Sequence, residues 1–492
     1  MLRYPIMWAN ISLIFGLCFV NAIFSKDVVS FVRTSLFLIC FFMLYRIRFK
    51  KSCLVVGGIT IATLYGCFFV QRSGQHTKKH TINGIFYFEK IFRTPSDRVG
   101  GIGNVYLKDH THCNDIYIHI KNRSGLKVAE DKLYRLHGTL YPLKFPFKAS
   151  QSFSYYLWAR GIRYHLAYAQ LKNVGNNLSP SLIQRLRWYF RKSLQAHFKD
   201  ANKSNTYQAI LLGKKELLSE KNLNHFFDTG TMHLFAVSGL HVGVVSTFLF
   251  FFFKSLFLPK IFRLFFTLAG VFLYSSIVGF SPSTLRASCM VLFVIIMQLC
   301  SRPVDGRAAF LNTAFFALAV NPWQIWDVGF QLSYGVVASI LGLGTPSSRR
   351  LSTQRNRFVR SFVASLCISV SASLISSVLT IYYWGMLTPW AFLVNLFLIP
   401  IASFVVILGT ISFITNLIFP SCLCIVNYLS ENVISLLLFC VDVCARLPGS
   451  VLKVSCNANI FYTCLFLFFL YVLKIHEGNS KLLTRSPTNT HL

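Results

Sequence analysis

Charged residues are scarce in this chain. Only 13% of its 492 residues are Asp, Glu, Lys or Arg, whereas 54% are hydrophobic and 16% are aromatic. Soluble domains usually carry about a quarter charged residues. The deficit comes from repeated apolar stretches of roughly 17 to 25 residues, which is the length that crosses a bilayer as a helix. This composition excludes an ordinary soluble domain and predicts a polytopic membrane protein.

Two other features are missing from the polar part of the chain. Most of the 14 cysteines lie in apolar runs, and only Cys113 falls in the long polar region that follows residue 70. One thiol cannot form an internal disulfide, so a fold stapled by cystines is excluded. A GxxxxGK[ST] phosphate-binding loop is also missing, so the sequence offers no such site for a nucleoside triphosphate.

About twelve apolar stretches are predicted to be membrane helices, and we expect the first to be a retained helix rather than a signal peptide. They cover approximately residues 5–24, 29–45, 53–70, 233–253, 259–278, 283–300, 307–320, 325–344, 361–382, 390–415, 423–445 and 458–474. Several are short or contain Gly or Pro, and such breaks are tolerated where protein or a water-filled cavity meets the backbone. The predicted fold is therefore mainly α.

The polar region between the third and fourth predicted spans has two parts. In residues 71–178, alternating runs such as NVYLKD and DIYIHIKN are separated by RVGGIG and NRSG, which predicts a small barrel of about five strands. In residues 179–230, Ser179 and Pro180 open a segment with apolar residues every three to four positions and with interspersed Arg and Lys. We expect a basic amphipathic helix there, most simply lying on the bilayer surface; packing on the β domain is the alternative.

Basic residues orient the predicted helices. With the N-terminus in the cytoplasm, the RIRFKK cluster and the loops that hold Lys254, Arg302 and Arg349 all lie on the cytoplasmic side, as the positive-inside rule requires. The polar region 71–230 is then extracytoplasmic. Residues 71–228 hold 26 Lys and Arg against 10 Asp and Glu. This excess points to a polyanionic partner, either nucleic acid or anionic lipid.

These patterns predict five consecutive parts of the chain. They are N-terminal membrane helices (1–70), an extracytoplasmic β domain (71–178), a basic amphipathic helix and linker (179–230), a transmembrane domain (231–475) and a basic cytoplasmic tail (476–492).

The segment TGTMHLFAVSGLHVGVV places polar side chains at the start of a predicted span. On one helix, Gly239 and Gly243 would form a small face that lets another helix approach closely. His233 and His241 would lie within about 80° of each other, with Ser238 on a neighbouring face. Because polar groups at membrane depth usually face protein or water, we expect this helix to line or close a polar passage. Hydrogen bonding between helices is the plainer alternative.

Three later segments also carry polar residues into predicted spans. In GFSPSTLRASCM, Pro282 is expected to break the chain between two spans, and Arg286 either reaches the interface or meets an anion in a cavity. In NPWQIWDVGFQLSYG, Asp327 lies where the chain re-enters the bilayer and could cap a helix. In WAFLVNLFLIP, Asn395 and Pro400 interrupt an apolar run. The candidate residues of these segments are Ser283, Arg286, Asp327, Gln331 and Asn395.

The order and spacing of these segments are typical of one family. The segments are FSYYLWARGI (153–162), AILLGKKELLSE (209–220), HLFAVSGLHVG (233–243), STLRASCM (283–290), NP with DVGFQLS (321–333) and WAFLVNLFLIP (390–400). Together they resemble the successive signatures of the ComEC competence protein family. The resemblance implies a plasma-membrane (bacterial inner-membrane) channel that takes up single-stranded DNA in natural transformation. It also implies that the external barrel is similar to an oligonucleotide-binding (OB) domain.

The resemblance further implies that the candidate residues line the passage or join its helices and have no catalytic role. Carried over by position, these residues are His233, Ser238, Gly239, His241, Gly243, Ser283, Arg286, Asp327, Gln331 and Asn395. No cofactor or metal is expected. The implied partners are single-stranded DNA, membrane lipids, a cytoplasmic motor or single-strand-binding protein, an external DNA receptor and a separate nuclease. Assembly with further copies of the chain is also compatible with the resemblance.

The chain departs from the family pattern in two places. Full-length relatives usually continue into a metallo-β-lactamase-like domain, whereas this chain stops about 20 residues after its last predicted span. We therefore expect nuclease activity to be absent or to be supplied by another protein. Lys214 and Lys215 follow Gly213 where the family typically has an acidic residue. This change argues against an acid or metal role at that position.

Single-stranded DNA is bound by basic grooves with aromatic stacking platforms. The outer region offers both in YLWARGIRYHLAYAQ, and the candidate DNA-binding residues are Tyr156, Trp158, Arg160 and Arg163. The nearby DHTHCND contains His110, His112 and Asp115, which resemble half of a zinc-hydrolase motif. The acid is one place late and no second set of ligands surrounds it, so we expect a surface or strand-packing role.

Two other functions use the same residues. An intramembrane serine hydrolase would employ Ser238 as nucleophile and His241 or a distant histidine as base, although the sequence offers no orienting acid nearby. A transporter of a small anion or a lipid intermediate would also need polar groups inside the helices.

Overall fold

The structure is a computed structural model of the chain. It describes residues 80–92, 98–107, 112–121, 133–143, 157, 162, 164–175, 182–321, 324–325, 327–351 and 356–454. The first three predicted spans, the last predicted span, and Tyr156, Trp158, Arg160 and Arg163 lie outside the described residues. The chain divides into two compact units, which are Met1–Pro180 with Ala308–Val328 and Ser181–Arg307 with Gly329–Leu492.

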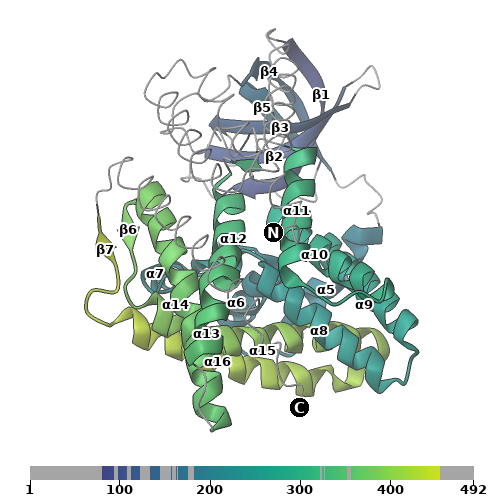
Figure 1. Cartoon of the computed structure of the whole chain (residues 1–492). Coiled ribbons are helices and arrows are strands. Elements are labelled where there is room, and N and C mark those ends of the chain that lie inside the picture. The colour runs from purple at the N-terminus through teal and green to yellow at the C-terminus, as the bar shows by residue number, and fades with distance from the viewer. Residues whose placement is uncertain are drawn as a thin grey trace, which may run out of the picture. The chain divides into compact units, whose positions relative to one another are not determined.

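Five strands of the first unit close into a barrel (Figure 1). They are β1 (His80–Phe92), β2 (Arg98–Leu107), β3 (His112–Lys121), β4 (Leu133–Pro142) and β5 (Tyr164–Gly175), in the spatial order β1-β2-β3-β5-β4. β1 pairs with both β2 and β4, which leaves no free edge, and β3 and β5 are the parallel pair. The alternating runs of the polar region therefore predicted the strands correctly.

Alternation along the strands fills the barrel interior. Phe86 and Phe88 on β1 are buried, as are Tyr134 and Leu136 on β4, so side chains two positions apart point the same way. The rings of Phe86 and Phe88 meet edge to face with centroids 4.7 Å apart. Ile116 on β3 belongs to the same core. This small core is closed by aromatic packing rather than by disulfides.

The second unit is helical and begins with short elements that the sequence analysis treated mainly as a linker. They are α5 (Leu182–Gln195), α6 (Ala201–Leu212), the 3₁₀ turn Lys215–Leu217, α7 (Glu220–Asp228) and the 3₁₀ turn Met232–Phe235. Every residue from Thr206 to Leu212 on α6 is buried. Tyr207 and Leu211 belong to the main hydrophobic core, which also contains side chains of α8, α9, α15 and α16. α6 is thus a central packing element of this unit.

Protein covers part of the apolar face of α5, and its position on the bilayer surface stays a prediction. Phe190 and Leu194 are buried in the same core, and the ring of Phe190 meets that of Phe413 on α15 at 5.1 Å. Arg187 donates hydrogen bonds to the Ile277 and Ser276 carbonyls, at 2.7 and 3.3 Å, where α9 ends. A guanidinium there compensates the negative end of the helix dipole. Leu182, Trp188 and Tyr189 on the same helix remain exposed.

Eight predicted spans fall within the described residues, and an apolar helix occupies each. The helices are α8 (Gly239–Ser255), α9 (Lys260–Val278), α10 (Pro282–Leu299), α11 (Gly306–Val320), α12 (Val328–Ser339), α13 (Thr345–Leu351), α14 (Arg357–Trp384), α15 (Ala391–Ile418) and α16 (Leu423–Ala445). A π turn (Ile340–Gly344) joins α12 to α13, and a 3₁₀ turn (Pro420–Cys422) precedes α16. Six of these segments are long and apolar enough to cross a membrane, while α8 and α11 are shorter. A two-stranded sheet pairs β6 (Met386–Leu387) with β7 (Leu452–Lys453). The chain is a membrane protein.

Two prolines of the predicted spans occupy different positions. α9 ends at Val278, its C-cap Gly279 adopts φ +101°, and α10 starts with Ser281 as N-cap and Pro282 in its first turn. The break at Pro282 was predicted correctly. Pro400 lies inside α15, and the helix continues through it from residue 391 to 418, in agreement with the single span predicted over 390–415.

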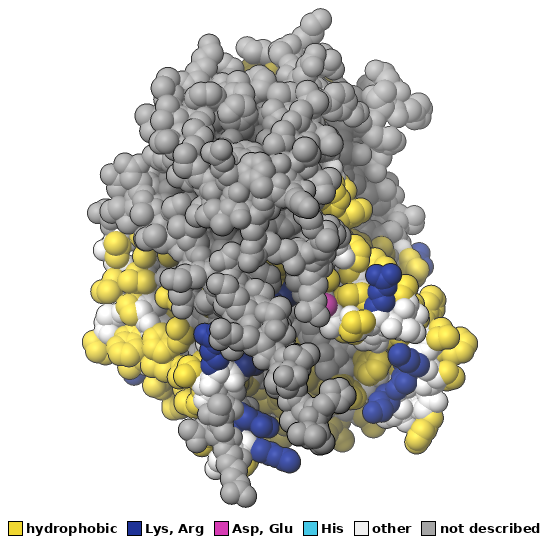
Figure 2. All heavy atoms as spheres, in the orientation of Figure 1, with side chains coloured by type: hydrophobic (Ala, Val, Ile, Leu, Met, Phe, Trp, Pro, Cys, Tyr) yellow, Lys and Arg dark blue, Asp and Glu magenta, His cyan; other side chains and the backbone are white. Residues whose placement is uncertain are grey.

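Large apolar side chains remain on the surface of the helical unit. Phe251 is 58% exposed on α8, Phe265 is 62% exposed on α9 and Phe439 is 65% exposed on α16. Figure 2 shows hydrophobic side chains over much of the described surface on one face, with Lys and Arg gathered in separate groups. Soluble monomers rarely expose apolar patches of such extent. These surfaces match a hydrocarbon environment around the helices.

Candidate functional site

The first helix of the predicted passage starts later than the sequence suggested. α8 begins at Gly239, with Ser238 as its N-cap and His241 at the third helical position. Nδ1 of His241 accepts a hydrogen bond from the Ser238 backbone N–H at 3.3 Å, and the Ser238 hydroxyl lies 3.0 Å from the same nitrogen. This is a capping box in which a histidine takes the place of the usual Glu or Gln.

This hydrogen bond fixes the proton on the imidazole. Because Nδ1 accepts, the remaining N–H must be on Nε2. His241 is only 1% exposed, and Nε2 has no hydrogen-bond partner among the described residues. A buried donor without a partner costs on the order of 1–3 kcal/mol. His241 therefore presents an unused N–H inside the helical core.

His233 belongs to a different element from His241 and is not part of the cap. It belongs to the 3₁₀ turn before α8, is exposed, and its Nδ1 lies 3.3 Å from the Gly230 carbonyl oxygen. The prediction that His233 and His241 share one helix, two turns apart, is therefore wrong. The chain between them is in part extended, with Ala236 in β conformation.

The two glycines of α8 have different surroundings. A Cβ at Gly239 would lie 3.7 Å from the Cβ of Ala287 on α10, so Gly239 does sit at a helix contact. At Gly243 a Cβ would meet nothing within 4 Å. Among the described residues, Gly239 is therefore the glycine of the predicted small-residue face that packs against another helix. Gly243 adjoins space that no described atom fills.

Three family-like segments meet at Val237. Gly213, the left-handed cap that ends α6, approaches Val237, because a Cβ on this glycine would lie 3.2 Å from its Cγ2. Ser283 at the start of α10 donates its hydroxyl to the Val237 carbonyl at 2.7 Å. We call this meeting point, with Ser238 and His241, the motif cluster. The segments AILLG, HLFAVSGLHVG and STLRAS, far apart in sequence, build it together.

Arg286 extends the motif cluster toward α12. Arg286 is 6% exposed, and its guanidinium donates from Nη2 to the Gly329 carbonyl at 3.0 Å. The rings of Phe330 and Tyr334 lie 5.6 and 5.4 Å from the guanidinium carbon. Cation–π contacts of this kind help to hold a desolvated guanidinium. Arg286 therefore joins α10 to α12.

The other three candidate residues occupy separate positions. Asp327 is buried directly before α12. Gln331 accepts a hydrogen bond from the Tyr383 hydroxyl of α14 at 2.8 Å. On α15, the side-chain oxygen of Asn395 is buried and has no hydrogen-bond partner among the described residues. The assignment of these residues to a passage stays a prediction.

A second polar region lies on α16 and was not predicted from the sequence. Asn427 is fully buried and donates from Nδ2 to the carbonyls of Ser193 and Ala196, both at 2.7 Å. Its Oδ1 accepts from the Ser412 hydroxyl of α15 at 3.0 Å. An amide on one helix thereby satisfies the carbonyls that end another. α16 fixes the C-terminus of α5 through this side chain.

Glu431, one turn further along α16, holds the turn between α5 and α6. Its carboxylate accepts from the Lys199 backbone N–H at 3.3 Å and lies 3.7 Å from the Lys203 ammonium. Tyr207 and Ser430 join α6 to α16 through their hydroxyls at 3.0 Å. The acidic Glu431 within a predicted span could have indicated this polar region, because ionisable residues in membrane helices usually have a partner.

The side chains of the histidine pair that resembled a zinc motif lie outside the described part of the structure, so the surface or strand-packing role stays a prediction. His112 and Asp115 lie on β3, and His110 is outside the described residues. Among the described residues, no group of three or more His, Cys, Asp or Glu side chains is placed to hold a metal ion.

Comparison with known proteins assigns the family. The chain is 26% identical over 206 residues to ComE operon protein 3 of Bacillus subtilis, covering 42% of this chain and 25% of that protein. It is 27% identical over 210 residues to Recombination protein 2 of Haemophilus influenzae, covering 40% of this chain and 27% of the relative. An uncharacterized protein of Aquifex aeolicus is 27% identical over 313 residues, covering 61% of this chain and 69% of that protein.

These alignments span about a quarter of the first two relatives. No solved structure matches the chain. The sequence model of the family described as Competence protein matches residues 210–477, which are 268 of the 492 residues. The match includes the motif cluster from Gly213 to Arg286. Since it covers more than half of the chain, the chain belongs to the ComEC competence protein family.

Proposed function

We propose that this protein is a membrane channel that takes up single-stranded DNA during natural transformation. The observation that carries the proposal is the motif cluster, in which three family-like segments converge on Val237, four residues before the buried His241. Its unused Nε2–H and the open space beside Gly243 would allow water or a DNA phosphate to approach α8. The buried Arg286 supplies positive charge on the neighbouring α10.

We infer that the barrel is an external OB-like domain that receives the strand. A closed barrel of five strands is compatible with the small barrels that bind oligonucleotides. The positive-inside pattern supports a cytoplasmic N-terminus and an extracytoplasmic position for residues 71–230 in the bacterial inner membrane. In this arrangement Tyr156, Trp158, Arg160 and Arg163 would contribute to DNA binding outside the cell membrane.

The channel would work with other proteins. Without a phosphate-binding loop in the sequence, a cytoplasmic motor, a single-strand-binding protein or the membrane potential would supply the driving force. An external receptor would deliver DNA, and a separate nuclease would degrade the second strand. The chain itself would act by transport and not by catalysis, and it could do so as a homo-oligomer.

Cytoplasmic accumulation of labelled DNA tests the proposal. Cells with the wild-type chain should protect incoming DNA from external nuclease, and cells lacking the chain should not. His241→Ala should reduce uptake, whereas Phe251→Ala, on the exposed face of the same helix, should leave uptake near the wild-type level. Normal DNA uptake in the deletion strain, with loss of flux of a small anion or lipid intermediate, would favour the transporter instead.

One contact favours a second candidate function, an intramembrane serine hydrolase. The Ser238 hydroxyl is 3.0 Å from Nδ1 of His241, within reach for activation of a nucleophile. The same nitrogen also accepts the Ser238 N–H, and no carboxylate among the described residues contacts Nε2. The geometry is better explained by helix capping. Labelling by a fluorophosphonate that disappears in Ser238→Ala would support the hydrolase and contradict the channel as the sole activity.

A further inference from the structure

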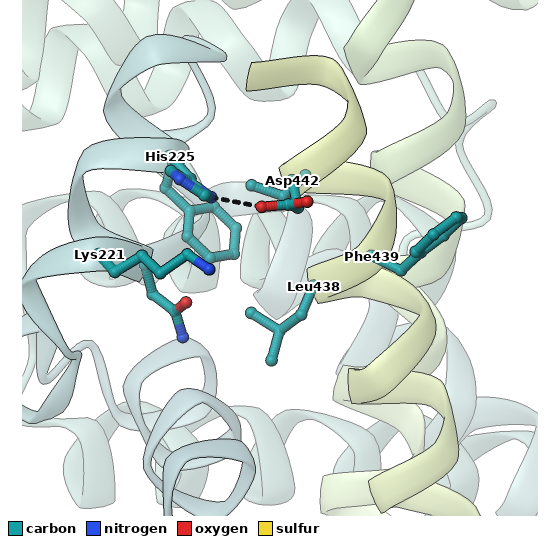
Figure 3. Close-up of a pocket in the computed structure, with 8 residues that line it drawn as sticks. Lys221, His225, Leu438, Phe439 and Asp442 are labelled. Atoms are coloured by element: carbon teal, nitrogen blue, oxygen red, sulfur yellow. Dashed lines mark ion pairs between the residues drawn. The ribbon is translucent and has the colours of Figure 1, made fainter. Parts of the chain in front are cut away.

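A polar cavity of about 270 Å³ lies between α7 and α16, and none of its lining residues belongs to the motif cluster. The side of α7 contributes Lys221, Asn222 and His225, and the side of α16 contributes Leu438 and Asp442. In Figure 3, Lys221 extends its amine from α7 into the space in front of α16, while Phe439 turns away from it. The cavity is smaller than the roughly 300–1,000 Å³ of typical small-molecule sites. It suits a compact polar group.

The carboxylate in this cavity already has two partners. Oδ1 of Asp442 lies 3.2 Å from Nδ1 of His225, and Oδ2 pairs with Arg446 one turn further along α16 at 2.5 Å. A carboxylate that is paired with a guanidinium repels an incoming anion less than an isolated one. The ion pair also holds α7 against α16.

Lys221 is the cation that remains. Its side chain forms no ion pair or hydrogen bond with the described residues, although it points into the cavity. Arg446 does not line the cavity, but its guanidinium pairs with Asp442, so this carboxylate does not need the charge of Lys221 for its compensation. A lysine is a common point-charge partner of phosphate. Asn222 and His225 add polar groups beside it.

We propose that this cavity binds a phosphate group of the single strand and that Lys221 is its principal ligand. The inference rests on the proposed function, and it adds a contact site outside the barrel and outside the motif cluster. α7 ends at Asp228, and the chain continues through the 3₁₀ turn to Ser238 at the start of α8. The cavity and the motif cluster are therefore built in part from neighbouring segments of the sequence. The site would hold the backbone and would not read bases, since phosphate contacts carry no sequence information.

Salt-dependent binding to the full chain tests the site. The wild-type chain is placed in nanodiscs of neutral lipid and titrated with a fluorescein-labelled oligothymidylate at several salt concentrations. Each phosphate contact in single strands contributes about 0.7 to the slope of log K against log salt. Lys221→Gln should lower that slope by about 0.7 and weaken binding about two- to fivefold, the effect of one exposed ion pair.

Lys215→Gln is the matched control. Lys215 is an exposed lysine in the 3₁₀ turn between α6 and α7, and it does not line the cavity. Its substitution removes the same charge from a neighbouring segment and should leave the slope unchanged. Thermal unfolding should be the same for both variants and the wild type, which separates a lost contact from a lost fold.

The outcomes distinguish this inference from the proposed function. If the wild type does not bind the oligonucleotide, both are wrong. If the wild type binds and Lys221→Gln keeps its slope, or Lys215→Gln loses as much, the cavity is not a DNA phosphate site. Nanodiscs with anionic lipid test the other source of phosphate. If Lys221→Gln changes only the retention of anionic lipid, the ligand is a lipid headgroup and the inference is overturned.

Discussion

The imidazole of His241 closes the first turn of α8 onto the backbone of Ser238, with Nδ1 3.3 Å from the Ser238 nitrogen. The contact joins residues three positions apart, which is the spacing of a capping box. It serves two purposes at once, because it ends the extended chain before α8 and directs Nε2 into the core without a partner among the described residues. A glutamine could serve the first purpose but would present different chemistry for the second.

Substitutions of His241 separate these two purposes. His241→Gln should keep the melting temperature of the purified protein close to that of the wild type, because Gln can accept the same backbone N–H. His241→Ala should lose about 1 kcal/mol, the usual effect of removing a cap. Thermal unfolding in detergent provides the measurement. Equal losses of stability in His241→Gln and His241→Ala would show that the imidazole does not stabilise the protein through the capping hydrogen bond.

Asn427 is expected to be essential for the packing of α5. Asn427→Ala removes both amide hydrogen bonds to the C-terminal end of α5. The Ser193 carbonyl keeps the Ser412 hydroxyl as donor, whereas the Ala196 carbonyl loses its side-chain donor, which costs about 1–3 kcal/mol. Unfolding should occur at lower temperature, and trypsin should cleave faster at Lys199 in the turn after α5. Asn432→Ala is the control, since Asn432 is exposed and bonds only within its own helix. Similar protease sensitivity in both variants would contradict the anchoring role.

Gly409 marks a close contact that a methyl group should disrupt. A Cβ at this position would collide with the side chain of Leu211, so α15 and α6 approach closely there. Gly409→Ala should cost about 1–3 kcal/mol by overpacking. Adding Leu211→Ala should make the two effects non-additive, with a coupling of about 0.5–3 kcal/mol. Gly243→Ala, in open space, should instead stabilise its helix by up to about 1 kcal/mol. Additive losses at Gly409 and Leu211 would contradict the contact.

The comparison of sequence and structure shows where local patterns were sufficient. Alternation predicted the strands because Phe86 and Phe88 must share the inside of a small barrel. Apolar length predicted the helices from α9 to α16 because hydropathy sets which segments can cross a bilayer. Both signals are averages over many residues, so single exceptions do not remove them. The family itself was predicted from short motifs and was confirmed over residues 210–477.

The errors arose where one contact overrides an average. Leu234, Phe235 and Val237 are as apolar as the span that follows, so hydropathy placed the helix start near residue 233. They are buried in the core as a 3₁₀ turn and an extended chain, and the cap at Ser238 determines the true start. Similarly, Gln208 is buried on α6 because Ser204, Arg191 and Gln195 satisfy its amide. Such partners are distant or unrecognisable before the fold is known.

His165 predicts a pH response of the barrel. Burial lowers the pKa of His165 below its ordinary value of 6.5, and its ring stacks on Tyr141 with centroids 5.4 Å apart. Between the lowered pKa and 6.5 the unfolded chain binds more protons than the folded barrel, so stability falls as pH falls through this window. The hydrogen-exchange protection factors of β4 and β5, which correct the rates for the pH dependence of intrinsic exchange, should therefore fall below pH 6.5. His165→Gln should reduce this loss of protection, and identical protection profiles against pH in wild type and variant would contradict the prediction.

The space beside Gly243 provides the most direct test of a passage. In a background without native cysteines, Gly243→Cys should fit without strain because a Cβ meets nothing within 4 Å. A charged thiol reagent reacts only with a thiolate in contact with water. If α8 lines a passage, Gly243→Cys should therefore be labelled, and bound oligothymidylate should slow the reaction. Phe251→Cys, on the 58% exposed apolar face, should be protected by lipid. Equal labelling rates for Phe251→Cys and Gly243→Cys would mean that the two faces of α8 are equally accessible to water. That result would contradict a passage along α8.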